Sequence, residues 1–179
     1  MMLLFLDTEY TGYGPSAPKL ISLALVAEDG QREFYVELTD TWQISDCTDF
    51  VRSKVVPLLG GSGHRLVEAR AKLHAWLSGA PRAVQAACDS GTDFGFLMNL
   101  LGTARVPNLM KKYFDLRPLI DSTVYHSKVV AAYHSDPREH HALVDARTYR
   151  LGWLAWMDSR KRTGTLRNHN YLDPGGRHR

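Results

Sequence analysis

Acidic residues and a pair of histidines occupy three separated segments of the chain. Asp7 and Glu9 lie in LLFLDTEYTG, and Asp93 lies in AACDSGTDFGFL. The third segment, EHHALVDAR, contains His140 and Asp145. Two like charges about 4 Å apart repel by roughly 4 kcal/mol at an effective dielectric near 20, so acids that converge need cations among them. Hard divalent ions such as Mg²⁺ take oxygen ligands, and the pattern therefore indicates a site for divalent metal ions.

The first acidic motif follows a continuous apolar run, Met2–Leu6, which is typical of a strand buried on both faces. In extended backbone the period of two places Asp7 and Glu9 on the same side of the strand. Ligands of α/β sheets gather at the carboxyl edge of the strands, so a D-x-E motif there suits a metal platform. Acids at strand ends are also common without a metal, and this motif alone does not identify a site.

The other two acids are expected on helices. Asp93 is predicted in the first turn of its helix, where the helix dipole also favours a carboxylate. Asp145 lies in the middle of HHALVDARTYRLGWL, where an unpaired carboxylate facing the core would be costly. Alternatively, Asp145 points to solvent and pairs with Arg147 or Arg150. The sequence pattern by itself leaves both interpretations open.

Apolar periodicity predicts the elements that must position these residues. Strands are expected over Met2–Leu6, Leu20–Val26, Glu33–Leu38, Arg82–Ala87 and Tyr113–Leu116. Helices are expected over Asp49–Leu59, Arg65–Leu77, the segment from Asp89 or Ser90 to Gly102, Thr123–Tyr133 and Glu139–Met157. The order predicts an α/β fold with a mixed five-stranded sheet flanked by helices. Residues 1–160 would form this domain, and residues 161–179 a basic, extended C-terminal tail.

Composition is that of an ordinary soluble domain with one core. The 179 residues are 44% hydrophobic and 23% charged. Cys47 and Cys88 are far apart and not in a C-x-x-C spacing, which predicts neither a disulfide framework nor a zinc site and fits a reducing cytoplasm. The apolar start MMLLFL is too short to span a bilayer and has no basic leader, so no signal peptide and no membrane anchor are predicted.

The formal net charge of +3 is unevenly distributed. Residues 1–137 contain 13 Lys/Arg and 15 Asp/Glu, a net charge of −2, whereas residues 138–179 contain 9 Lys/Arg and 4 Asp/Glu, a net charge of +5. A basic region beside an acidic cluster is suited to a polyanionic substrate and its metal ions. Alternatively, Arg160, Lys161 and Arg162 only solvate a helix end, where cations also favour the helix dipole.

Taken together, LFLDTEY, LISLALVAEDG and HHALVDAR resemble the DEDD superfamily of 3′-to-5′ exonucleases. The order D-x-E, then Asp, then H-x-x-x-x-D resembles its histidine subtype, DEDDh, and is most similar to small bacterial single-domain exoribonucleases. The resemblance covers nearly all of the predicted domain, and its motifs fall on the first strand, a strand-to-helix junction and the last helix. It implies a ribonuclease-H-like fold.

The resemblance also implies a site for two Mg²⁺ or Mn²⁺ ions. Asp7 would bridge both ions, and Glu9 and Asp145 would complete the site of the ion that holds the attacking water. Asp93 would serve the second ion, largely through water. In general, two ions about 3.5–4 Å apart steady both the attacking and the leaving oxygens of an in-line displacement.

The histidine of such a site would accept a proton from the attacking water, and two adjacent candidates are present. The family spacing selects His140, five residues before Asp145. If the last helix already includes residue 141, His141 instead shares a face with Asp145 through i,i+4 spacing. Near the first motif, Thr8, Tyr10 and Thr11 are expected to contact substrate. Tyr10 and Tyr13 would stack on a base, or they would pack beside the neighbouring prolines.

The expected function is 3′-to-5′ hydrolysis of single-stranded nucleic acid with a free 3′ end, RNA in preference to DNA, which releases nucleoside 5′-monophosphates. The alternatives are a DNA exonuclease of the proofreading or repair type and a non-catalytic nucleic-acid-binding domain of the same fold. The sequence departs from the family pattern at Cys88-Asp89, where many relatives carry His-Asn. A homodimer is also compatible with the resemblance, with Trp42, Trp153 or Trp156 supplying an apolar contact.

Overall fold

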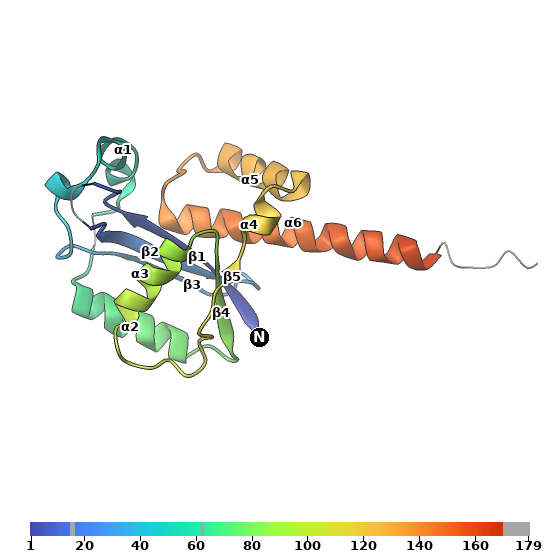
Figure 1. The fold of residues 1–179 in the computed structure, drawn as a ribbon, viewed down its shortest axis with the longest axis horizontal. Coiled ribbons are helices and arrows are strands. Elements are labelled where there is room, and N and C mark those ends of the chain that lie inside the picture. Colours follow the sequence, from blue (N-terminus) through green and yellow to red (C-terminus); the bar gives the residue numbers. More distant parts are fainter. Residues whose placement is uncertain (15–16, 62, 170–179) are drawn as a thin grey trace, which may run out of the picture.

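The computed structural model describes residues 1–14, 17–61 and 63–169, and its centre is a five-stranded sheet in the order β3-β2-β1-β4-β5 (Figure 1). The strands are β1 (Met2–Tyr10), β2 (Leu20–Ala27), β3 (Glu33–Glu37), β4 (Val84–Cys88) and β5 (Phe114–Asp115). The first three strands pair antiparallel, whereas β4 pairs parallel with both β1 and β5. The predicted mixed five-stranded α/β sheet is therefore confirmed, and its topology is consistent with a ribonuclease-H-like fold.

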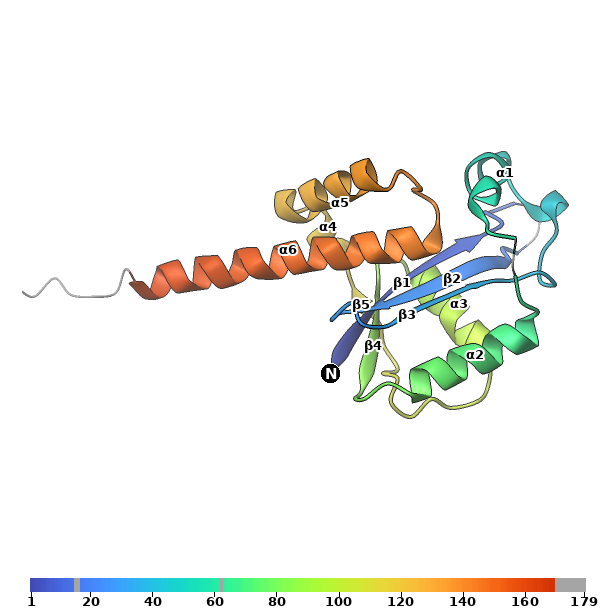
Figure 2. The same cartoon turned by 180° about the vertical axis from the view of Figure 1, so that it is seen from behind.

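Helices cover both faces of this sheet, and Figure 2 shows the same layers from behind. The α-helices are α1 (Asp49–Lys54), α2 (Leu66–Ser78), α3 (Gly91–Leu101), α4 (Arg117–Ile120), α5 (Thr123–Ser135) and α6 (Ala142–His169). Short 3-10 turns occupy Ile44–Asp46 and Val56–Leu58. The predicted helix over Asp49–Leu59 is thus two shorter elements, because Pro57 lies in the second of them and cannot continue the α-helical hydrogen bonds of the first.

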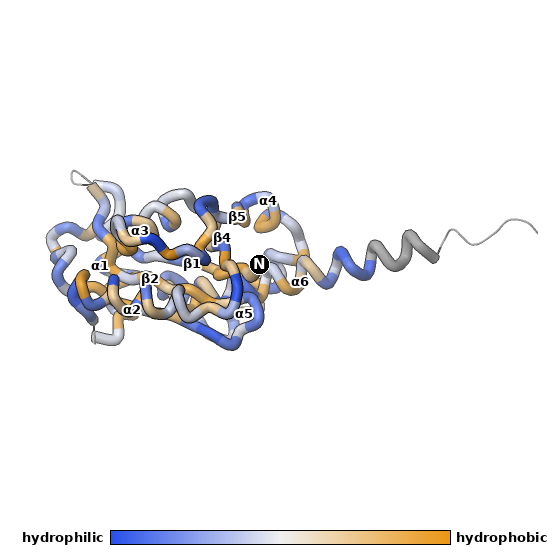
Figure 3. The backbone as a smooth tube through the Cα atoms, turned by 90° about the horizontal axis from the view of Figure 1, so that it is seen from below, coloured by the Kyte–Doolittle hydropathy of each residue, from blue (hydrophilic) through white to orange (hydrophobic). Residues whose placement is uncertain are grey.

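Strand β1 lies in the middle of the sheet and alternates its side chains between two cores. Leu4 and Leu6 belong to the cluster that α2 and α3 cover, whereas Leu3 and Phe5 belong to the cluster beneath α4, α5 and α6. Much of β1 is apolar in Figure 3, as expected for a strand whose residues are buried on both faces. The alternation continues past Leu6, and it decides toward which layer each residue of the D-T-E motif points.

The last helix differs from its prediction at both ends. It begins at Ala142 rather than Glu139, and it continues to His169, well beyond Met157 (Figure 1). The predicted extended tail is therefore wrong for residues 161–169, and the expected boundary at residue 160 falls inside α6. Lys and Arg are good helix formers, and no proline occurs between Pro137 and Pro174, so no proline interrupts the helix at its basic segment. The remaining tail residues, 170–179, lie outside the described residues.

No helix in the described part of the chain combines the length and apolar character needed to cross a membrane.

Candidate active site

An open cleft lies where β1, the start of α3 and the start of α6 meet. It contains all five residues predicted to be catalytic, which come from segments far apart in the sequence. Its lining consists of Asp7, Thr8, Glu9, Tyr10, Asp89, Ser90, Asp93, Tyr133, Glu139, His140, Asp145 and Tyr149. Polar surface dominates this cleft, in contrast to the mainly apolar grooves elsewhere on the described molecule.

Strand β1 distributes its three motif residues between the two faces of the sheet. Asp7 and Glu9 follow Phe5 in the alternation and therefore share the face covered by α6, as the period of two predicts. Thr8 follows Leu6 and points toward the α3 layer, where its hydroxyl donates to Asp93 Oδ1 at 2.5 Å. Strand β1 thus directs Asp7 and Glu9 toward α6, and through Thr8 on its other face it also hydrogen-bonds Asp93 of α3.

Asp93 is placed by the first turn of α3. Ser90 caps this helix, and its Oγ accepts a hydrogen bond from the Thr92 amide at 3.0 Å. Of the two residues expected to begin this helix, Asp89 and Ser90, the structure thus selects Ser90, and the helix ends at Gly102, in a positive-φ conformation, as predicted. Because the helix starts directly after β4, its first turn lies at the same sheet edge as the end of β1, and the Asp93 side chain is buried there.

Asp145 lies in the first turn of α6 and faces the cleft rather than solvent. Its side chain is 7% exposed, and neither Arg147 nor Arg150 pairs with it: Arg147 binds Glu33, and Arg150 donates to the Glu28 carbonyl. The carboxylate instead accepts from the His140 amide at 3.0 Å. The interpretation of Asp145 as a solvent-exposed partner of arginine is therefore wrong.

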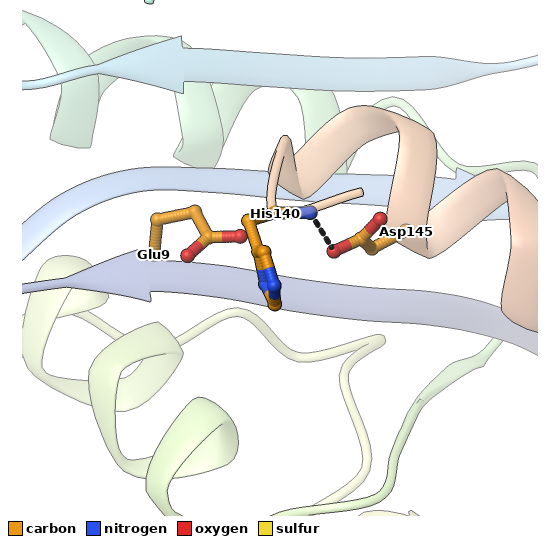
Figure 4. Close-up of side chains that lie close together, drawn as sticks. All are labelled: Glu9, His140 and Asp145. Atoms are coloured by element: carbon orange, nitrogen blue, oxygen red, sulfur yellow. Dashed lines mark hydrogen bonds between the residues drawn. The ribbon is translucent and has the colours of Figure 1, made fainter. Parts of the chain in front are cut away.

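The two candidate histidines point to different places. His140 precedes α6 with φ at +71° and lies between Glu9 and Asp145 (Figure 4). Potential ligand atoms of these three residues all lie within 4.8 Å of one another. The His140 ring meets Phe50 of α1 edge-to-face, with 4.9 Å between the ring centroids. The positive φ is uncommon for a residue with a side chain, and it turns His140 into the cleft.

His141 faces the core instead of the cleft. Its ring is 9% exposed and stacks on Tyr35, with the ring centroids 4.8 Å apart. The helix begins only at Ala142, so the condition for His141 to share a helical face with Asp145 is not met. Of the two alternatives, the geometry favours His140.

Gathering four carboxylates without a cation disfavours their ionisation. Burial raises the pKa of Asp7 well above its ordinary value, and the charges of the surrounding acids raise it further. Burial, followed by the charges of Asp145 and Asp93, raises the pKa of Glu9 to about 8. Burial likewise raises the pKa values of Asp93 and Asp145 to about 7 each, although hydrogen bonds from Thr8 and Tyr133 oppose the shift.

These acids have the donor chemistry of a divalent metal site. Asp7 Oδ2 is buried and has no hydrogen-bond partner among the described residues. An ionised oxygen in that position is costly unless a cation compensates it. Carboxylate oxygens converging on one cleft, with an imidazole beside them, fit hard ions such as Mg²⁺ or Mn²⁺.

The predicted substrate contacts are only partly in the cleft. Thr8 and Tyr10 line it, whereas Thr11 is 2% exposed and accepts the Lys19 amide at 3.0 Å, so Thr11 supports the start of β2 rather than the cleft. Tyr10 packs on Phe96, with 5.3 Å between the ring centroids, and the rings of Tyr10 and Tyr13 form an edge-to-face pair with 5.6 Å between their centroids. Tyr13 is 68% exposed.

Several cleft residues were not predicted from the sequence. Tyr149 donates to Asp89 Oδ2 at 3.0 Å, and Tyr133 donates to Asp145 Oδ1 at 3.0 Å. Two signals could have found the first pair: Asp89 directly follows β4 at the sheet edge that carries the motif, and Tyr149 is four residues after Asp145 on the same helical face. Tyr133 comes from α5, and no spacing in the sequence relates it to Asp145.

The cleft therefore combines carboxylate ligands, an imidazole that can accept a proton and aromatic rings at its edge. This combination can hold divalent cations against an anionic substrate and activate water. Neither a scan against protein-family models nor a search of curated proteins found a match to this chain.

Proposed function

We propose that the chain is a metal-dependent 3′-to-5′ exonuclease that hydrolyses single-stranded RNA ends and releases nucleoside 5′-monophosphates. One observation carries the proposal: acids from the beginning, middle and end of the sequence, together with His140, line a single cleft. Their order in the sequence also resembles that of the DEDDh exonucleases. A carboxylate cluster of this kind has little structural value, since burial and mutual repulsion disfavour its charges.

Asp7, Glu9, Asp93 and Asp145 would hold two Mg²⁺ or Mn²⁺ ions. Bound there, the ions would neutralise phosphate charge and stabilise the attacking and leaving oxygens of the displacement. The role of Asp7 is supported by the charges of the neighbouring acids, which all act to raise its pKa, and by its buried oxygen without a hydrogen-bond partner among the described residues. Thr8 would keep Asp93 oriented through its 2.5 Å hydrogen bond.

His140 would accept the proton of the attacking water. Imidazole is the side chain that most often performs this step near neutral pH. The His140 ring is held by Phe50 on one side, and its backbone amide is held by Asp145. The proposed general base, His140, is thus hydrogen-bonded through its backbone to a proposed metal ligand, Asp145, and this contact helps to place the imidazole beside the metal site.

The direct test is product analysis on RNA and DNA oligonucleotides of identical sequence, labelled at the 5′ or the 3′ end, with Mg²⁺, Mn²⁺ or chelator. We expect stepwise release of nucleoside 5′-monophosphates from RNA 3′ ends, no reaction in chelator and no reaction on a 3′-blocked strand. Faster degradation of DNA would replace the RNA part of the proposal with a DNA exonuclease. Internal cleavage of the blocked strand, or no cleavage under any condition, would overturn the proposal.

Substitutions at the two histidines should separate their roles. We expect His140→Ala to lower kcat about 10²–10⁴-fold, the usual contribution of a general base. His141→Phe keeps a ring stacked on Tyr35 but removes both nitrogens, and we expect it to retain wild-type turnover. Steady-state kinetics on a 5′-labelled oligonucleotide measures both variants. The assignment is reversed if His141→Phe is the variant that loses turnover.

A further inference from the structure

Tyr133 reaches the acid cluster from a helix that carries none of the motif residues. It lies near the end of α5, 12 residues before Asp145, and its phenol oxygen donates to Asp145 Oδ1 at 3.0 Å. The side chain is half-buried, and it lines the cleft together with the acids and His140. Its hydroxyl is therefore directed at a proposed metal ligand and not at the core.

Asp145 is held at both of its carboxylate oxygens. Tyr133 donates to Oδ1, and the His140 amide donates to Oδ2, also at 3.0 Å. A carboxylate has about four lone-pair sites, so two donors leave each oxygen free to accept another partner. Because the donors come from α5 and from the turn before α6, they fix the rotation of the carboxylate relative to the cleft. Asp7, by contrast, has an oxygen that no described residue contacts by a hydrogen bond.

Helix α5 is a firm support for this contact because it packs closely along α6. Tyr125 of α5 lies directly over Gly152 of α6: a Cβ atom added to Gly152 would be 2.7 Å from the Tyr125 ring. Tyr125 is 1% exposed, and its hydroxyl donates to the Tyr149 carbonyl at 3.3 Å. In the turn between α5 and α6, the Arg138 guanidinium forms a hydrogen-bonded ion pair with Asp136.

We propose that Tyr133 is a positioning residue that orients the Asp145 carboxylate for a divalent cation and thereby sets the metal affinity of the cleft. The inference rests on the proposed function, because it assumes a metal site at these acids. A phenol suits the task, since it donates a hydrogen bond without the positive charge by which Lys or Arg would compete with the cation. Outer donors of this kind typically contribute 10–100-fold to metal affinity.

The test is calorimetric titration of the full chain with Mg²⁺, in the absence of nucleic acid. We expect Tyr133→Phe to weaken Mg²⁺ binding about 10–100-fold. Tyr125→Phe is the matched control: it removes a hydroxyl from the same helix, at the same interface with α6, but this hydroxyl donates to the backbone carbonyl of Tyr149 and not to a carboxylate. This control is expected to bind Mg²⁺ as the wild type does. Thermal unfolding in chelator verifies that both variants are folded.

Two outcomes would overturn the inference without affecting the proposed function. One is wild-type Mg²⁺ affinity in Tyr133→Phe, and the other is an equal loss of affinity in both tyrosine variants, which would show a general effect of α5 packing. Asp7→Asn tests the metal site itself in the same titration. If Asp7→Asn binds Mg²⁺ as tightly as the wild type, the proposed metal site is wrong and the inference falls with it.

Discussion

The double substitution Asp7→Asn with Glu9→Gln is expected to abolish nuclease turnover and, in chelator, to make the fold more stable. The loss of activity should be about a thousandfold or more, since metal ions supply several kcal/mol of charge stabilisation and each 1.36 kcal/mol is a factor of ten in rate. The gain in stability follows from burial: both acids have raised pKa values because their ionised forms are poorly solvated and face other carboxylates.

The measurement pairs oligonucleotide degradation in Mg²⁺ with thermal unfolding in chelator at pH 8. Asp121→Asn serves as the control. Asp121 does not line the cleft, so this substitution removes one negative charge from the protein but leaves the acids of the cleft unchanged. It should change neither turnover nor the unfolding temperature appreciably. Retained activity in the double variant would disprove the metal site, and a lower unfolding temperature in chelator would contradict the electrostatic argument. An active protein that needs these acids also excludes the non-catalytic binding domain.

Stability in chelator is expected to fall as the pH rises from about 4 to 8, and saturating Mg²⁺ should remove most of this fall. The pKa values of Asp93 and Asp145 rise from 3.8 to about 7, and that of Glu9 from 4.5 to about 8, all chiefly through burial. A raised folded pKa stabilises the fold below the unfolded pKa, and this contribution is lost as the pH rises through the folded value. One pKa unit corresponds to 1.36 kcal/mol, so a shift of about three units in any one of these acids corresponds to a fall of roughly 4 kcal/mol.

Glu33, Asp136 and His141 also have shifted pKa values. They either change the stability outside the range from about pH 4 to 8, or change it within this range by a small amount in the opposite direction. Hydrogen bonds from Arg147 and Arg138 lower the pKa values of Glu33 and Asp136, so these acids contribute stability that is lost only below about pH 4. Burial lowers the pKa of His141, whose contribution is present above pH 6.5 and is lost as the pH falls. The effect of this one histidine on stability is opposite to that of the cleft carboxylates, whose pKa shifts are larger and more numerous. The carboxylates should therefore determine the sign of the pH dependence.

Urea unfolding across this pH range, in chelator and in Mg²⁺, measures the effect. The increase in unfolding free energy caused by Mg²⁺ should grow with pH, because the ion binds the ionised carboxylates and only the folded state gathers them. The double variant at Asp7 and Glu9 should show a flatter pH dependence in chelator. Stability that rises steadily with pH in chelator would mean that the acids are better solvated than their burial indicates.

Local patterns in the sequence were sufficient to predict the sheet and the acids. The continuous apolar run before Asp7 requires a strand buried on both faces, and the period of two then places Asp7 and Glu9 on one side. Ser90 and Gly102 mark the ends of α3 through capping preferences that act over a few residues. Each of these features depends on neighbours in the chain, which is why the sequence alone could indicate them.

The boundaries of the last helix were not predictable in the same way. Residues 139–141 continue its polar and apolar pattern, yet the chain there adopts a turn with φ at +71° at His140. The turn is held by hydrogen bonds from the His140 amide to Asp145 and from Arg138 to Asp136. These contacts decide that His140 enters the cleft while His141 stacks on Tyr35 of a distant strand.

The composition and order of motifs thus determined an α/β domain with acids at one sheet edge. Only the tertiary structure decided which histidine faces them, that Thr11 lies beneath the surface, and that Tyr133 and Tyr149 donate to acids of the cleft. The physical reason is the range of the interactions. Strand alternation and helix caps are properties of adjacent residues, whereas the contact of Tyr133 with Asp145 exists only because α5 packs along α6.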